Sequence, residues 1–496
     1  QTKGEEVNLD TIPLDDQKSF KTLSEGLTVG IFQLESSGMR RNIKELKPTS
    51  IFDLMAMVAL YRPGPMQVIP DFINRKNNPE QIRYPDPRLK EVLKQSYGLI
   101  TYQDDVLLTS IALAGYSWGD ADKLRKAVGK KIPAEMEKQK KQFIAGCIKN
   151  GLTESRAREI FELIEPFAGY GFNKAHAACY ATIAYQTAYL KTHYPVEFMT
   201  AVLIAESKAS AGPVHEQRLS QLVEECRRMR LKLLTPDVNT SDVEFSIEEL
   251  KGREGKIRFG LADVKNVGSA AIDTILAARR RSGRFLSFTD FCTRVELGKV
   301  NKKTIESLVK SGAMDAFGRR ASILASYPTI VERIQKAKKQ ESQGQIGLFG
   351  EEEESNASGD EALLEVEEFS KSEILGFEKE LLGFYVTDHP LRSFESQLSQ
   401  KVTHQIGEFT LEDRGRSVII GGIVARRKQI VTKKSNEEMA FVQIEDTSGN
   451  IEAVVFPKTY AKVRNTLVPD AVVIIKGKID ERNEELTLVI EEVFSI

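Results

Sequence analysis

Apolar residues recur at helical spacing through residues 1–230, and residues that end helices separate the apolar stretches. Residues 61–65, Tyr-Arg-Pro-Gly-Pro, cannot continue a helix, and Asn150 with Gly151 makes a helix exit. Pro133 suits the first turn of a helix, where its missing N–H is not needed. These signals predict helices over residues 50–60, 88–95, 105–113, 119–128, 133–150, 154–166 and 175–193.

The spacing changes in the last part of the chain, where short apolar runs between turn residues are typical of β-strands. The predicted strands cover residues 418–424, 441–444, 451–456, 472–479 and 486–490. Five short strands within about 80 residues indicate a small Greek-key barrel of the oligonucleotide-binding (OB) type. Shorter β-like runs lie at 245–247 and 256–260, and short helices are expected over 261–335.

A polar segment separates the helical part from the strands. Residues 337–359 are rich in Gln, Ser, Gly and Glu, a composition that cannot bury a core and predicts a mobile linker. A chain of 496 residues also exceeds a single core, so three or four domains are expected. The predicted fold class is therefore mixed and multidomain, mainly α-helical, with an all-β barrel at its C-terminal end.

Composition narrows the class of protein. The apolar share of 41% and charged share of 28% are those of a globular protein, and no run of about 18 apolar residues predicts a membrane span. The four cysteines lie far apart, which argues against a zinc site or disulfide framework and favours the cytoplasm. The first residues lack Met and an apolar signal core, so we expect the chain to begin within a longer one.

The net charge of −1 argues against a general nucleic-acid binder, but the charges are unevenly distributed. Within residues 123–149 the acids are Glu135 and Glu137, and an acidic run occupies residues 351–354. The basic residues of the same stretch are Lys123, Arg125, Lys126, Lys130, Lys131, Lys138, Lys140, Lys141 and Lys149. A local basic face with a compensating acidic linker fits a phosphate-binding protein.

Three segments have the character of a phosphate-binding site. In the first, residues 60–65, two prolines and a glycine hold Arg62 on a rigid turn. In the second, residues 119–131, Lys126 and Lys130 share one face of the predicted helix, where an anion between them would relieve their repulsion.

The third segment, residues 169–176, combines two glycines with a helix start. Its glycines let the backbone approach a ligand closely, and Asn173 can cap a helix that begins near Lys174. Lys174 and His176 would then lie in the first turn, where backbone N–H groups attract anions.

Taken singly, these segments have plainer interpretations. The lysines of residues 119–131 also fit a solvated helix face, and a glycine-rich turn more often serves only the fold. An ATP-binding kinase or ligase is a further alternative, although the chain contains no G-x-x-x-x-G-K-[ST] phosphate loop.

Five motifs taken together resemble the alpha subunit of bacterial DNA polymerase III, a C-family replicative polymerase. They are GIFQLES at 30–36, YRPGP at 61–65, YGLITYQ at 97–103, LRKAVGKK at 124–131 and FAGYGFNKAH at 167–176. They occur in the family's order and cover most of residues 20–205. The resemblance implies the end of the palm over residues 1–50 and the fingers over 51–235.

The resemblance also implies that the basic fingers helices face the triphosphate of the incoming deoxynucleoside triphosphate and the template. The candidate nucleotide contacts carried over are Arg62, Arg125, Lys126, Lys130, Asn173, Lys174 and His176.

The metal site is expected elsewhere. The resemblance places the catalytic aspartates and their Mg²⁺ ions on the palm, upstream of residue 1, so this chain alone should be inactive although the complete enzyme is a DNA-directed DNA polymerase. The internal pair Asp104 and Asp105 is a poor clamp, because adjacent helical side chains point about 100° apart. We expect these aspartates to be structural, as a helix cap and a first-turn acid.

Residues 259–268 precede a predicted helix, 269–281, and have the glycine-containing pattern of a helix–hairpin–helix turn. Such turns bring backbone N–H groups and a helix start to a DNA phosphate without reading sequence. A compact helical turn is the plainer alternative, but the family carries such hairpins after its fingers, which suggests a duplex-binding domain over residues 236–335. The candidate contacts are Lys265, Asn266, Gly268, Arg279 and Arg280.

The predicted linker, residues 336–360, contains Gln-Ile-Gly-Leu-Phe at 345–349. This pentapeptide resembles the segment by which bacterial DNA polymerases bind the ring-shaped sliding clamp. Leu348 and Phe349 would fill an apolar pocket, and Gln345 would bond at its rim. The alternative is that the pair packs on this protein's own surface.

The final barrel, residues 416–496, follows a helical lead-in over residues 361–415. OB barrels bind single strands through a basic groove with exposed aromatic rings, and Arg426 with Lys428 supplies charge here.

Two functions remain open on the sequence alone. The first is template-directed DNA synthesis, with primer–template DNA, nucleotide and clamp as partners and the clamp loader and a proofreading subunit as further candidates. The second is a non-catalytic scaffold that binds DNA and clamp.

Overall fold

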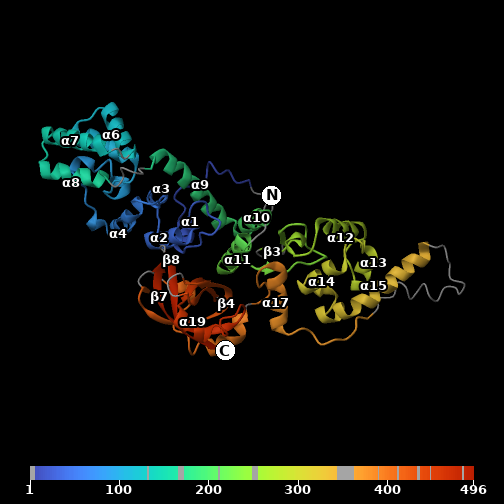
Figure 1. Ribbon diagram of the computed structural model, residues 1–496. Helices are drawn as coiled ribbons and strands as arrows, with labels where there is room; N and C mark the ends of the chain where they lie inside the picture. Colours follow the sequence, from blue (N-terminus) through green and yellow to red (C-terminus); the bar gives the residue numbers. More distant parts are fainter. Residues whose placement is uncertain are drawn as a thin grey trace. The chain divides into compact units, whose positions relative to one another are not determined.

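The computed structural model describes residues 6–130, 133–165, 172–209, 213–248, 255–342, 362–388, 390–409, 413–432, 436–446, 448–482 and 485–496 (Figure 1). The chain divides into an N-terminal unit, Gln1–Pro195, and a C-terminal unit, Val196–Ile496. Each unit has its own internal packing and is considered by itself. The mixed, multidomain fold class with a C-terminal OB-type barrel is confirmed.

The described part of the N-terminal unit is helical. Its helices are α1 (Gln17–Ser24), α2 (Ser37–Leu46), α3 (Ile51–Leu60), α4 (Ile69–Asn77), α5 (Gln103–Ala114), α6 (Trp118–Lys130), α7 (Pro133–Lys149), α8 (Glu154–Ile164) and α9 (Lys174–His193). Six of the seven predicted helices are found within two residues of their expected ends. The apolar pattern did not single out α1, α2 and α4.

The core of this unit forms around two long apolar contacts. Helix α3 is almost wholly buried and packs against α9, whose inner face carries the small residues Ala177, Ala181 and Ala184. Helix α5 packs against α6 and α7, and α7 packs against α8, so α6, α7 and α8 form a group of their own (Figure 1). Small residues on α9 allow the backbones of α3 and α9 to approach closely. This packing sets the position of the start of α9 relative to α3.

The predicted helix over residues 88–95 is wrong. The segment instead forms two short 3₁₀ turns, Pro87–Leu89 and Lys94–Ser96. Tyr97 and Gly98 follow with left-handed φ angles of 55° and 83°, and a side chain at Gly98 would meet the Arg83 carbonyl oxygen at 2.4 Å. The left-handed turn at Tyr97 and Gly98 ends the segment, which follows Pro87 as two turns and not as one continuous helix.

The C-terminal unit begins with helices and a small sheet. Helices α10 (Pro195–Ser207) and α11 (Pro213–Arg228) precede strands β1 (Leu233–Leu234), β2 (Ser246–Glu248) and β3 (Lys256–Arg258), which pair in the order β1-β3-β2. Helices α12 (Ser269–Ser282), α13 (Phe288–Arg294), α14 (Lys302–Lys310) and α15 (Arg320–Ser342) follow. The β-like runs at 245–247 and 256–260 are thereby confirmed as strands.

Helix α15 corrects two expectations. It has 23 residues, so it is not one of several short helices, and it continues through residues 337–342, which were expected to begin the linker. Glu, Lys and Gln form helices readily, so a composition too polar for a core can still extend an existing helix. Residues 343–361 lie outside the described residues.

The expected helical lead-in contains α17 (Lys371–Leu382) and the short α18 (Glu395–Leu398). Ser370 caps α17, and Glu373 completes a capping box. Leu375, Tyr385 and Leu391 of this region form a small core with Ile423 of the barrel.

The barrel consists of β4 (Ser417–Val431), β5 (Glu438–Glu445), β6 (Asn450–Val455), β7 (Val472–Arg482) and β8 (Glu485–Ser495), closed in the order β4-β5-β6-β8-β7. The long strand β4 pairs with β7 through its first half and with β5 through its second half. A register shift between Val424 and Arg426 marks the change of partner. Helix α19 (Pro457–Val463) packs against β5 and β8.

Candidate nucleic-acid interface

The start of α9 is built by residues from three separate segments. Asn173 caps the helix by accepting the His176 N–H at 2.9 Å, as predicted. The carbonyl of Phe172 accepts the N–H of Gln103 at 3.0 Å, which joins this segment to the start of α5. Asp104 accepts the Lys174 N–H at 3.1 Å. The chain therefore already occupies part of the anion-attracting helix end that the sequence suggested for a ligand.

Aromatic rings hold the cationic side chains at this helix start. The Arg62 guanidinium lies 4.2 Å from the centre of the Phe172 ring, and the Lys174 ammonium lies 5.5 Å from the Tyr102 ring. His176 contacts the Phe172 ring at 5.1 Å. Cation–π contact fixes a cation without neutralising its charge. We name Arg62, Asn173, Lys174 and His176 the α9 cluster.

Arg62 is the most informative member of the α9 cluster. Its Nε atom is buried, and it has no hydrogen-bond partner among the described residues. A guanidinium fork binds phosphate oxygens in a planar, bidentate geometry. The sequence showed the charge of Arg62 but not Phe172 and Tyr102, whose only signal is an aromatic residue just before each helix start.

The second basic segment is organised differently. On α6, Arg125 and Lys126 both bond to Asp122, each at 2.7 Å, and Lys123 bonds to Asp120 at 3.0 Å. Hydrogen bonds from Lys126 and then Arg125 hold the pKa of the Asp122 carboxyl below its usual range. The side chain of Lys130 and the glycines of residues 169–171 lie outside the described residues.

Asp104 and Asp105 have the structural role that was expected. The Oδ2 atom of Asp105 accepts the N–H groups of Thr101 at 2.8 Å and Tyr102 at 2.9 Å, which caps α5. Burial raises the pKa of Asp105 to about 6. Among the described residues no group of three or more His, Cys, Asp and Glu side chains could hold a metal ion. The residues described here thus do not fit a Mg²⁺ site.

The predicted hairpin lies between the 3₁₀ turn Leu261–Asp263 and α12. Asn266 has a left-handed φ of 69°, its carbonyl accepts the Thr304 hydroxyl at 3.0 Å, and its amide donates to Ser307 at 3.1 Å. Helix α14 therefore holds the hairpin. Asn266 is fixed by these bonds, but it is exposed, as is Lys265.

Gly268 marks the open side of the hairpin. It caps α12 without a side-chain hydrogen bond, and a Cβ atom placed on it would meet nothing within 4 Å. No part of the described chain therefore requires a glycine here for space. A helix start without a side-chain cap, beside an uncovered glycine, fits the approach of an external phosphate.

The two arginines of α12 that were predicted to contact DNA differ in their surroundings. Arg279 donates to the carbonyls of Val238 at 3.1 Å and Ser241 at 2.8 Å, and its side chain is only 17% exposed. It joins elements within the unit and is not a free cation. Arg280 is exposed.

On the barrel, Arg426 and Lys428 are exposed and lie two residues apart on β4, hence on one face. Lys428 is paired in register with Phe441 of β5, and the Arg482 guanidinium lies 5.0 Å from the Phe441 ring. The intervening Arg427 donates to the carbonyls of Arg464 and Leu467 beyond α19. Arg482 was missed because it lies in a different strand from the other cations.

The clamp-binding residues Gln345, Leu348 and Phe349 lie outside the described residues. Within the described part of the chain, no helix is both long enough and apolar enough to cross a membrane.

The arrangement is that of a multidomain protein built from a helical unit, a hairpin-containing helical module and an OB-type barrel. Residues 1–151 match the family model of the bacterial DNA polymerase III alpha subunit finger domain. Residues 230–323 match the helix–hairpin–helix motif, and residues 418–496 match the OB-fold nucleic acid binding domain.

Whole-chain comparison gives the family. The chain is 40% identical over 493 residues to the DNA polymerase III subunit alpha of Borreliella burgdorferi, which covers 99% of this chain. It is 38% identical over 503 residues to that of Pseudomonas aeruginosa, covering 96% of this chain, and 37% identical over 505 residues to that of Escherichia coli K12, covering 99%. The chain belongs to the family of bacterial DNA polymerase III alpha subunits. It spans 42% of the length of each of these three relatives.

Solved structures resemble only a short part of the chain. Asparaginyl-tRNA synthetase from Pyrococcus horikoshii is 22% identical, with a TM-score of 0.16, over 18% of this chain and 22% of its own. The second OB-fold domain of replication protein A from Methanococcus maripaludis is 13% identical, with a TM-score of 0.16, over 19% of this chain and 93% of its own.

Proposed function

We propose that this chain takes part in template-directed DNA synthesis by a bacterial replicative DNA polymerase in the cytoplasm. In this proposal the α9 cluster contacts the triphosphate of the incoming nucleotide. The hairpin around Gly268 contacts the duplex, and the barrel face around Phe441 contacts the single-stranded template. The catalytic carboxylates and their Mg²⁺ ions belong to a part of the enzyme outside this chain.

The observation that carries the proposal is the state of Arg62. Its guanidinium is held against Phe172, yet its buried Nε has no partner among the described residues. A buried donor without a partner costs about 1–3 kcal/mol, so a ligand that accepts from it gains that much relative to the free protein. Lys174 beside it adds the charge that favours a phosphate, and His176 adds a ring nitrogen that can donate a hydrogen bond.

Two observations in the C-terminal unit also support the proposal. The start of α12 lacks a side-chain cap at an uncovered glycine, and the barrel places Lys428 and Arg482 beside an aromatic ring. Stacking on such a ring is worth about 1–3 kcal/mol per base.

The test uses this chain with a fluorescein-labelled primer–template and Mg²⁺. We expect the anisotropy to report binding that falls steeply as salt rises, because phosphate contacts release counterions. A primer-extension assay on the same sample should show no added nucleotide. Incorporation would refute the placement of the metal ligands, and absence of DNA binding would refute the duplex contacts.

The clamp contact is proposed on residues 345–349. Leu348→Ala with Phe349→Ala should abolish retention of this chain on the immobilised sliding clamp, because the two apolar side chains supply the buried area of such short peptides. Glu353→Ala with Glu354→Ala is the matched control and should leave retention intact. Retention of both double variants would remove the clamp from the proposal.

A scaffold that binds DNA and clamp without serving catalysis is the second candidate. The favouring observation is that the uncapped start of α12 and the barrel face around Phe441 could bind DNA without any catalytic step. The scaffold predicts that substitutions in the α9 cluster leave the KM for nucleotide unchanged in the complete polymerase, whereas the proposed function predicts a rise.

A further inference from the structure

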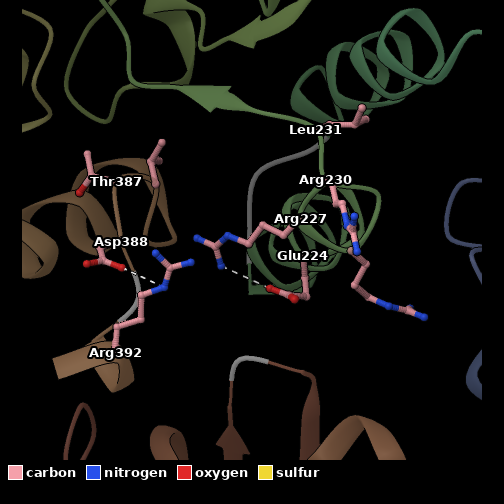
Figure 2. Close-up of a pocket in the computed structure, with 9 residues that line it drawn as sticks. Glu224, Arg227, Arg230, Leu231, Thr387, Asp388 and Arg392 are labelled. Carbon is pink, nitrogen blue, oxygen red and sulfur yellow. Dashed lines mark hydrogen bonds and ion pairs between the residues drawn. The ribbon is translucent and has the colours of Figure 1, made fainter. Parts of the chain in front are cut away.

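A cavity of about 420 Å³ lies within the C-terminal unit, between the end of α11 and residues 386–392 (Figure 2). None of its lining residues belongs to the hairpin, the barrel face or the α9 cluster. Four of them are arginines: Arg227, Arg228, Arg230 and Arg392. A volume of this size lies within the range of sites that bind small molecules.

The carboxylates that line the cavity do not balance these arginines. Glu224 and Asp388 are the two acids of the lining, and Glu225 just outside it pairs with Arg228 at 3.2 Å, which leaves a formal excess of one positive charge. Asp388 is also bonded to Lys371 at 2.5 Å, a closer contact than the 3.4 Å from Asp388 to Arg392. The Arg392 side chain is 69% exposed. Its positive charge is therefore only partly compensated.

Figure 2 shows the guanidinium groups of Arg227 and Arg392 pointing toward one another from opposite walls. Arg227 is anchored by Glu224 at 3.3 Å and by the carbonyl of Tyr385. Two cations that face each other repel unless an anion lies between them. Guanidinium pairs of this kind suit the oxygens of a phosphate group.

The end of α11 brings Arg230 and Leu231 to the cavity. Arg230 has a left-handed φ of 60° because it ends the helix: its N–H bonds to the Arg227 carbonyl, and the Leu231 N–H bonds to the Cys226 carbonyl. Leu231 and Val386 provide apolar wall between the charged groups, where a sugar or base can pack.

We propose that this cavity binds a phosphate-bearing ligand of nucleotide size, with a phosphate group held between Arg227 and Arg392. The phosphate comes either from a free polyphosphate or from one nucleotide unit of a DNA strand. The site does not depend on the proposed function, so its failure would leave the polymerase contacts unaffected.

The test maps arginine reactivity. This chain is treated with phenylglyoxal alone, with inorganic pyrophosphate, or with a twelve-nucleotide oligothymidylate, and each arginine is quantified by peptide mass spectrometry. We expect one of the two probes to slow modification of Arg230 and Arg392 at least fivefold. Arg416, an exposed barrel arginine paired with Asp413 at 2.9 Å, should react equally in all samples.

The pattern identifies the source of the phosphate. Protection by pyrophosphate assigns the cavity to a free polyphosphate, and protection by the oligonucleotide alone assigns it to a DNA strand. No protection by either probe would overturn the proposal.

A double variant, Arg230→Gln with Arg392→Gln, gives an independent reading. Its melting temperature should stay near that of the parent chain, because both side chains are exposed. The protecting probe should no longer shield Arg227 in it. If Arg227 stays shielded, the phosphate binds elsewhere and the assignment of this cavity is wrong.

Discussion

Two basic sites of the N-terminal unit hold their cations in opposite ways. In the α9 cluster, Arg62 and Lys174 face the aromatic rings of Phe172 and Tyr102, which leave the positive charge available. On α6, Arg125 and Lys126 share the carboxylate of Asp122. Aromatic support therefore keeps a cation ready for a ligand, whereas an acid one turn earlier satisfies it within the helix.

The difference shows what the spacing of lysines and arginines alone leaves out, namely the acids that pair with them. Counting bases from residue 123 onward omits Asp120 and Asp122, which precede that stretch by one turn. Such i,i+3 and i,i+4 pairs are worth only about 0.3–0.5 kcal/mol, so a phosphate can still displace them. The candidate role of Arg125 and Lys126 thus remains a prediction.

The largest expected effect separates the two sites directly. In the complete polymerase, Arg62→Ala should lower kcat/KM for nucleotide incorporation about 100-fold, or roughly 2.7 kcal/mol, because it removes a charge that has no ion-pair partner among the described residues. Arg125→Ala should lower it less than about threefold, since Asp122 already offsets that charge. Single-nucleotide incorporation at varied nucleotide concentration measures both.

Arg62→Lys is the control for lost packing against Phe172. It keeps the charge but not the planar fork, so its kcat/KM should lie between those of the parent and Arg62→Ala. Equal losses in the alanine variants at positions 62 and 125 would show that the aromatic support makes no difference.

A second contrast, of about 2 kcal/mol, lies on α12 of the C-terminal unit. Arg279→Ala should lower the free energy of unfolding by about that amount, because two backbone carbonyls lose their donor. Arg280→Ala should leave stability unchanged and reduce the salt dependence of DNA binding by about one ion. Thermal unfolding and anisotropy titrations distinguish them; a DNA-binding defect without destabilisation in Arg279→Ala would reverse their roles.

The smallest expected effect is the change of folding stability with pH that is caused by Asp105, the cap of α5. The pKa of Asp105 is raised from 3.8 to about 6, so the folded state holds a proton that the unfolded chain has lost. Its contribution to stability is full below pH 3.8 and disappears as pH rises through about 6. Between pH 5 and pH 8 the loss should be about 1 kcal/mol.

Asp105→Asn should remove this slope, since the side-chain amide oxygen can still accept the N–H groups of Thr101 and Tyr102. Urea unfolding at pH 5, 6.5 and 8 measures the slope in parent and variant. An identical slope in both would show that another group titrates.

The sequence predicted helices best where one face is apolar and a capping residue marks the start. Asn173 and the residues before Pro63 bounded α9 and α3 closely. The segment around Leu89 failed because its two buried leucines lie at helical spacing, while the left-handed turn at Tyr97 and Gly98 ends the segment. The spacing of apolar residues indicates which of them are buried. A series of turns can bury them as well as a helix can.

The candidate site was predictable as a set of cations but not as a geometry. Arg62, Lys174 and His176 gather because α3 packs against α9, a long-range contact that no local pattern contains. The internal bonds of Arg279 were unpredictable for the same reason, because the carbonyls of Val238 and Ser241 that it bonds lie about 40 residues earlier in the chain. The charge of a side chain can be read from the sequence, whereas the groups that compensate this charge depend on the fold.

The double pairing of β4 has a consequence for how other molecules can attach to the barrel. Because that strand bonds to β7 through residues 417–423 and to β5 through residues 423–431, each half of it has one neighbouring strand within the described barrel. The closed strand order nevertheless gives every described strand two partners. Room for an added peptide strand therefore remains at the second edge of each half of β4.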